Sequence, residues 1–182
     1  AVKMGVRSGF RILYHCTYAD DEAIELLAAR KDSMFVAPTI GIVQATLDAT
    51  PPPHMDMSHM KEDAAIVLEH QKALVPKLRA RGVRLLPGGD YGFPFNPNGR
   101  NAWDLELWVR HFGYTPKEAL NAATELGGQL MDLDVGLIKQ GYLADLLVVD
   151  GDPTQDVRVL QDKNNLTAIM KDGQLHKAPE AL

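Results

Sequence analysis

Short apolar runs alternate with amphipathic stretches through the first half of the chain. The runs at 10–14, 34–39 and 83–86 have the length of buried strands. The stretches 22–30 and 61–81 place apolar side chains at helical spacing, and a glycine follows the second one. Strands and helices that alternate in this way, with connections long enough for crossovers, predict parallel βαβ units.

Residues 40–60 interrupt this pattern. They include three consecutive prolines, Pro51–Pro53, with methionines and histidines close by. Proline fixes φ and removes a backbone donor, and a long segment without clear periodicity is typical of a surface loop. We expect an irregular excursion over these residues, either a loop or a mobile lid.

Two further helices are predicted after residue 100. Apolar side chains can share one face over 103–111. Thr115 is followed by Pro116 and then by Glu118, which is typical of a capped helix start. This second helix is expected to run to about residue 131.

The pattern changes once more in the last quarter of the chain. Residues 143–150 and the segment around the turn Asp172–Gly173 are short apolar runs separated by turn residues, which predict strands and hairpins. We therefore expect an α/β part over 1–134 and a β-rich module over 135–182.

Composition narrows the classes of function. The 182 residues are 46% hydrophobic and 24% charged, with a net charge of -5 and no basic stripe, so we expect no nucleic-acid partner. The apolar runs are too short to span a membrane, and no signal peptide or lipidation motif opens the chain. We expect a cytoplasmic protein without membrane association. The single cysteine, Cys16, excludes an intrachain disulfide framework.

Two residues with ligand chemistry follow predicted strands. Asp90 stands in a glycine-rich turn directly after the strand at 83–86, and His15 follows the strand at 10–14. Alone, Asp90 is equally compatible with an Asx-type turn, and a single histidine is usually structural. Because the carboxyl ends of parallel strands meet at one edge of a sheet, the two together favour a functional site.

Three more residues near this edge are candidate substrate contacts. Thr39 ends the strand at 34–39, while Tyr91 and Phe93 follow Asp90 closely and could line an apolar pocket. The alternative for the two aromatic residues is ordinary packing after a strand. No glycine-rich phosphate loop follows any predicted strand, which argues against a nucleotide-binding domain.

Longer motifs carry a family resemblance. Residues 113–124 read GYTPKEALNAAT, residues 136–153 read GLIKQGYLADLLVVDGDP, and residues 169–174 read IMKDGQ. Together they resemble the carboxyl-terminal signature of the metal-dependent amidohydrolases. Within that superfamily the chain is most similar to the branch of imidazolonepropionase-like enzymes, Xaa-Pro dipeptidase-like hydrolases and related amide, carbamate and phenylurea hydrolases.

The resemblance implies the fold and the chemistry. It implies the carboxyl-terminal part of a (β/α)8 TIM barrel, from the sixth strand onward, plus part of a small β-sandwich domain. His15 matches the histidine after the sixth strand, which would bind the second metal in a binuclear member or contact the water or substrate in a mononuclear one. Asp90 matches the aspartate after the eighth strand, which binds the first metal and takes a proton from the attacking water. The resemblance implies one or two divalent metal ions as cofactors, with zinc the expected ion because imidazole suits zinc.

Several family features have no counterpart in this chain. The His-x-His pair after the first strand, the carboxylated lysine after the fourth and the histidine after the fifth are absent. Three strands cannot close a barrel of eight. Because the sequence opens within an apparent helix stopped by Gly9, we expect a fragment, whose partner is the N-terminal half of the same enzyme or a completing chain.

The sequence therefore leads to two functional hypotheses. The first is a metal-dependent hydrolase, homo-oligomeric, that cleaves a C–N bond in a small amide, peptide-like or urea-like substrate with metal-activated water, this chain being its carboxyl-terminal portion. The second is a non-catalytic truncated half-barrel that serves as an assembly or interaction module.

Overall fold

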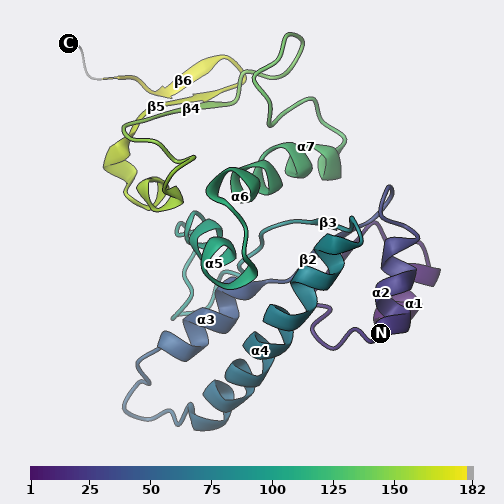
Figure 1. The fold of residues 1–182 in the computed structure, drawn as a ribbon. Helices are drawn as coiled ribbons and strands as arrows, with labels where there is room; N and C mark the ends of the chain where they lie inside the picture. Colours follow the sequence, from purple (N-terminus) through teal and green to yellow (C-terminus); the bar gives the residue numbers. More distant parts are fainter. Residues whose placement is uncertain (180–182) are drawn as a thin grey trace.

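The computed structural model describes residues 1–179, and a short parallel sheet lies at its centre (Figure 1). Strands β1 (Ile12–Tyr14), β2 (Phe35–Ala37) and β3 (Arg84–Leu85) pair in parallel in the order β1-β2-β3. The prediction of parallel βαβ units is therefore confirmed. Every residue of β2 is buried, as expected for the middle strand.

Helices join and cover these strands. They are α1 (Val2–Arg7), α2 (Asp21–Ala28) and α4 (Ser58–Ala80). The Asp20 side chain caps α2 by accepting a hydrogen bond from the Ala23 backbone N–H at 2.9 Å. Leu27 of α2 and Leu78 of α4 are completely buried in the core, together with Val36 of β2. In this described part of the chain no helix, α4 included, is both long and apolar enough to cross a membrane.

The prediction for residues 40–60 was wrong over part of its length. Helix α3 (Ile40–Asp48) follows β2 directly, and α4 already begins at Ser58, so only 49–57 are irregular. The prolines lie within that short connection, and α3 itself contains none. Ile40, Val43 and Ala45 are buried, so the tertiary packing of an apolar helix outweighed the irregular character of the surrounding sequence.

The helices after residue 100 form at the expected places, with one difference. Helix α5 (Trp103–Phe112) is followed by α6 (Pro116–Ala123) and α7 (Glu125–Met131), which the sequence predicted as one helix. Thr115 and Glu118 form a complete capping box at the start of α6. The break falls at Thr124, whose hydroxyl donates to the Leu120 carbonyl at 2.9 Å, a local bond that competes with regular helix geometry.

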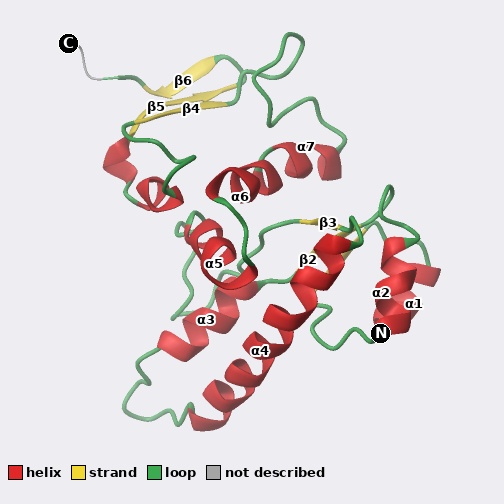
Figure 2. Ribbon diagram, viewed as in Figure 1, coloured by secondary structure: helices red, strands yellow, loops and turns green. Residues whose placement is uncertain are grey.

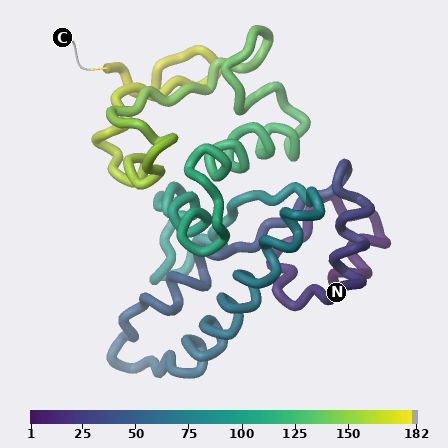
Figure 3. Tube along the Cα trace, viewed as in Figure 1, coloured from purple at the N-terminus to yellow at the C-terminus, as the bar shows by residue number. Residues whose placement is uncertain are grey.

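A second sheet forms a separate layer beyond α6 and α7 (Figures 1 and 3). Strands β4 (Leu146–Val149), β5 (Leu166–Lys171) and β6 (Gln174–Lys177) pair antiparallel in that order, with the 3₁₀ helices η1 (Val157–Gln161) and η2 (Lys163–Asn165) before β5. These strands confirm the β-rich character of this part of the chain (Figure 2). The division at residue 134/135 stays a prediction, and residues 180–182 of that module lie outside the described residues.

Two features of this sheet concern its β5–β6 turn and its β4 edge. The Asp145 carboxylate pairs with Lys171 and accepts the backbone N–H of Asp172 at 2.7 Å, which fixes the β5–β6 turn against the start of β4. Strand β4 is an edge strand, and Leu147 and Val148, which point to opposite faces, are 54% and 57% exposed. An unpaired aliphatic edge of this kind is normally covered in a folded protein.

Candidate functional site

The candidate residues follow the carboxyl ends of the three parallel strands. His15 comes directly after β1, Thr39 lies two residues beyond β2, and Asp90 stands in the irregular turn after β3. All three adopt the left-handed conformation, with φ of 62°, 57° and 52°, and Cys16 does so as well. Non-glycine residues pay a steric penalty there, and such strain concentrates at functional sites.

The structure brings His15 and Asp90 together. Nε2 of His15 lies 4.0 Å from Oδ2 of Asp90, and the two side chains are 54% and 47% exposed. An imidazole and a carboxylate that face each other at an open sheet edge can hold a divalent cation or share a proton.

The hydroxyl of Thr39 contacts the ring of His15. Its Oγ1 lies 2.5 Å from Nδ1 of His15 and donates its single hydrogen to the Pro38 carbonyl at 2.7 Å. Oγ1 therefore lies between the His15 ring and the Pro38 carbonyl, a position in which it can accept a hydrogen bond from Nδ1. Gln71 of α4, which is completely buried, holds the same Pro38 carbonyl through its Nε2 at 2.5 Å.

This arrangement fits part of a metal centre. A metal-binding histidine commonly donates its second ring N–H to an outer acceptor, and Oγ1 of Thr39 lies where such an acceptor would stand. Within residues 1–179, no cluster of three or more His, Cys, Asp or Glu side chains could hold a metal ion. Among these residues His15 and Asp90 form a pair and not a cluster of three.

Cys16, next to His15, does not offer a nucleophile. Its side chain is buried, and burial raises the pKa of the thiol to about 11. Because the thiolate is the reactive form, Cys16 is not a candidate for the chemistry of this edge.

The aromatic candidates surround the turn after β3 in different ways. The Tyr91 ring packs on Gly89 so closely that a Cβ there would lie 2.2 Å from it, and its hydroxyl is 3.5 Å from the Asn101 carbonyl. Burial and the nearby Asp104 raise the pKa of Tyr91. Phe93 is 45% exposed and stacks on Phe95 with ring centroids 5.7 Å apart. Phe93 is thus the aromatic side chain that is more open to a ligand.

Sequence reasoning missed two buried polar residues beneath this turn. Asn96 is completely buried, and its Nδ2 donates to the carbonyls of Gly89 at 2.8 Å and Asp90 at 3.1 Å. Asp104 of α5 is 3% exposed, and burial raises its pKa to about 6. Asp104 lies four residues before the buried Trp108, a helical spacing that signals a carboxylate on an apolar face.

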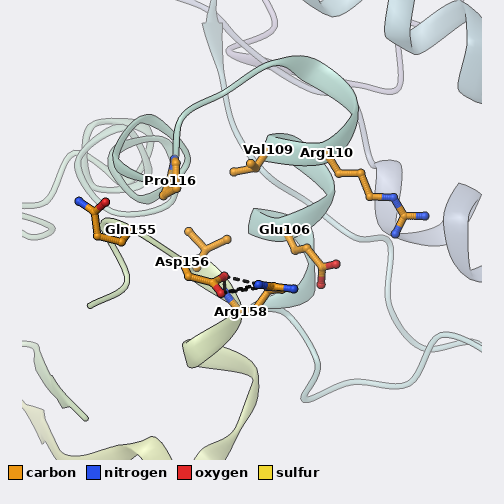
Figure 4. A pocket seen from close by; sticks show the side chains of 8 residues that line it. Glu106, Val109, Arg110, Pro116, Gln155, Asp156 and Arg158 are labelled. Atoms are coloured by element: carbon orange, nitrogen blue, oxygen red, sulfur yellow. Dashed lines mark hydrogen bonds and ion pairs between the residues drawn. The ribbon is translucent and has the colours of Figure 1, made fainter. Parts of the chain in front are cut away.

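Two cavities are lined by residues other than His15 and Asp90. One, of about 920 Å³, is lined mainly by apolar side chains of α6, α7 and β4, with Tyr91 and Asp104 at its border. The other, of about 340 Å³, lies between α5 and η1, where Arg158 pairs with Asp156 at 2.7 Å (Figure 4). Neither cavity is lined by His15 or Asp90, although Gly89 and Tyr91, the two neighbours of Asp90 in the chain, line the larger one.

The comparison with protein families identifies the chain. A sequence model of the Amidohydrolase family matches residues 10–176, which is most of the sequence. The chain belongs to the amidohydrolase family.

Individual relatives agree with this assignment. Ochratoxinase from Aspergillus niger is 30% identical over 182 residues, which is 98% of this chain but 36% of that protein. The crystal structure of A. niger ochratoxinase matches with a TM-score of 0.83 at 23% identity, covering 100% of this chain and 40% of that one. A Xaa-Pro dipeptidase with bound methionine in its active site matches with a TM-score of 0.76 at 26% identity, covering 97% and 42%. This amidohydrolase chain thus has a mixed α/β fold that corresponds to about two fifths of hydrolases of known structure.

Proposed function

We propose that this amidohydrolase chain supplies part of a metal-dependent active site that cleaves a C–N bond in an amide, peptide-like or urea-like substrate. The observation that carries the proposal is the His15–Asp90 pair, with Nε2 of His15 4.0 Å from the Asp90 carboxylate. Both residues stand at the carboxyl ends of parallel strands, where such folds place their active sites. The relatives named above, ochratoxinase and a Xaa-Pro dipeptidase, are hydrolases.

His15 and Asp90 would have different roles in this reaction. Nε2 of His15 and the Asp90 carboxylate would hold one or two divalent ions, with zinc the expected ion. A bound ion of this kind lowers the pKa of water and polarises the scissile carbonyl. Asp90 is placed to accept the proton of the attacking water and to return it to the leaving amine. Phe93, exposed beyond the same turn, is proposed to contact the substrate.

The remaining ligands would come from outside this chain. It spans 36% of the length of ochratoxinase, and its β4 edge exposes aliphatic side chains. We propose that residues 1–134 form the last βα units of a (β/α)8 barrel and residues 135–182 part of a β-sandwich. Both would be completed by the N-terminal half of the same enzyme or by a second chain, in a homo-oligomeric assembly.

Metal removal tests the proposed chemistry. We expect the full natural protein to contain zinc or another divalent ion and to hydrolyse N-acyl amino acids or dipeptides. Dialysis against a chelator should reduce hydrolysis at least a hundredfold, and added zinc should restore it, because water is a poor nucleophile at neutral pH without the ion. Metal content by mass spectrometry and rates on a panel of amides are the measurements.

The rival hypothesis makes the opposite prediction. A non-catalytic assembly module would bind no divalent ion at the stoichiometry of the protein and would cleave none of the panel. Activity that survives chelation with no metal retained would also contradict the proposal.

Thr39 provides a sharper test of the His15 geometry. Thr39→Val removes the acceptor that orients Nδ1 of His15, so zinc affinity should fall by about 10–100-fold. Thr46→Val is the matched control, because Thr46 is also buried and its hydroxyl bonds only the Ile42 carbonyl within α3 at 2.8 Å. Zinc affinity is measured by competition with a chromophoric chelator. If Thr39 contacts substrate instead, KM should rise while zinc affinity stays unchanged.

A further inference from the structure

We propose that Asn96 is the positioning residue that holds the Asp90 carboxylate in place, an inference that rests on the proposed function of that carboxylate. Asp90 occupies the left-handed region with φ of 52°, and no strand or helix includes it. Backbone in that region is less favourable than ordinary backbone for a residue with a Cβ, although aspartate and asparagine tolerate it better than most residues. The conformation therefore needs a partner that stabilises it.

Asn96 provides that partner from the centre of the loop. Its Nδ2 donates one hydrogen to the Gly89 carbonyl at 2.8 Å and the other to the Asp90 carbonyl at 3.1 Å. The first carbonyl belongs to the peptide plane before the Asp90 Cα, and the second belongs to the plane after it. Since φ and ψ are the rotations of these two planes about Cα, one amide group fixes both angles of Asp90.

The backbone of Asn96 is itself anchored to the same turn. Its N–H donates to the Phe93 carbonyl at 2.9 Å, and its carbonyl accepts the Gly92 N–H at 3.0 Å. Residues 89–96 are thereby closed into one hydrogen-bonded unit. The direction of the Asp90 side chain follows from Asn96, although the two residues are six positions apart.

A role in global stability alone does not account for this residue. Asn96 is completely buried, and among residues 1–179 its Oδ1 has no hydrogen-bond partner. A buried carbonyl oxygen without a hydrogen-bond partner lowers the free energy of unfolding. Keeping an amide here is explained by its two N–H donors, which the Asp90 backbone uses.

Hydrogen–deuterium exchange and zinc binding in the full natural protein test the inference together. Asn96→Ala should raise exchange within residues 86–95 while the rest of the chain keeps its protection. Zinc affinity should fall tenfold or more, and kcat should fall more than KM rises. Asn98→Ala is the matched control, because Asn98 lies exposed in the same loop and should leave all three measurements unchanged.

Each outcome of these measurements supports or contradicts the role of Asn96. Unchanged exchange and zinc affinity in folded Asn96→Ala would overturn the proposal, as would a rise in exchange spread evenly over the chain. If that variant does not fold, Asn96→Gln carries the test, since it keeps both donors one methylene further out and should give smaller changes of the same kind. Should the wild-type protein bind no zinc and cleave no amide, the proposed function fails, while the exchange measurement still decides whether Asn96 holds the turn.

Discussion

Asp90→Asn should abolish amide hydrolysis by the full natural protein and leave its fold intact. Asparagine has nearly the same shape and tolerates the left-handed conformation that Asp90 adopts, so the turn should persist. The amide cannot accept the proton of the attacking water, and proton transfer of this kind contributes roughly 10²–10⁴ in rate, with weaker metal binding lowering the rate further. The measurements are kcat/KM and the thermal midpoint.

Asp172→Asn is the control for this change. Asp172 is also a left-handed aspartate, with φ of 49°, but it stands at the β5–β6 turn, away from the strand ends of the parallel sheet. Its replacement should alter neither kcat/KM nor the midpoint appreciably. Near-normal turnover by Asp90→Asn would remove Asp90 from the mechanism.

Gly41→Ala should damage both the stability and the activity of the protein. Gly41 lies in the first turn of α3, where a Cβ would stand 2.7 Å from the Gly89 Cα, 2.9 Å from its carbonyl oxygen and 2.6 Å from Oδ1 of Asp104. The backbone of Gly89 cannot move aside as a flexible side chain can. Helix α3 and the turn that contains Asp90 would therefore have to move apart. Overpacking of this kind lowers the free energy of unfolding by about 1–3 kcal/mol, outweighing the better helix propensity of alanine.

Gly88→Ala is the matched substitution in the facing turn. A Cβ at Gly88 would lie 3.7 Å from the nearest atom, the Ala37 Cβ, which is an ordinary contact. Urea unfolding should therefore show little change for Gly88→Ala and a clear loss for Gly41→Ala. Equal effects would mean that the close approach of α3 to the turn is not what fixes the Asp90 loop.

Much of the fold could be predicted because it depends on local patterns. The strands at 12–14, 35–37 and 84–85 lie within apolar runs, and the capping box at Thr115 is visible in the sequence. Helix α3 was not predicted, because the proline-rich residues that follow it favoured an irregular segment over the whole of residues 40–60. Its formation depends on burial against α4 and α5, which no local window contains.

The candidate site could be predicted only as far as residue type and position at a strand end allow. His15 and Asp90 were found by that reasoning, and the structure brings their side chains within 4.0 Å. Thr39 and His15 are 24 positions apart in the sequence. The hydrogen bonds from Asn96 to the carbonyls of Gly89 and Asp90 depend on the backbone angles of the turn. Hydrophobic periodicity reports which residues are buried, and it carries no information on such polar contacts.

The left-handed residues at the strand ends also affect how this protein can diverge. Asparagine is among the few residues that accept φ near 52° at low cost, and a single base change converts an aspartate codon to an asparagine codon. Replacing Asp90 by asparagine therefore removes the carboxylate without adding strain to the backbone at position 90. If Asp90 carries the proposed chemistry, one base change would remove that chemistry and leave the backbone of the turn intact.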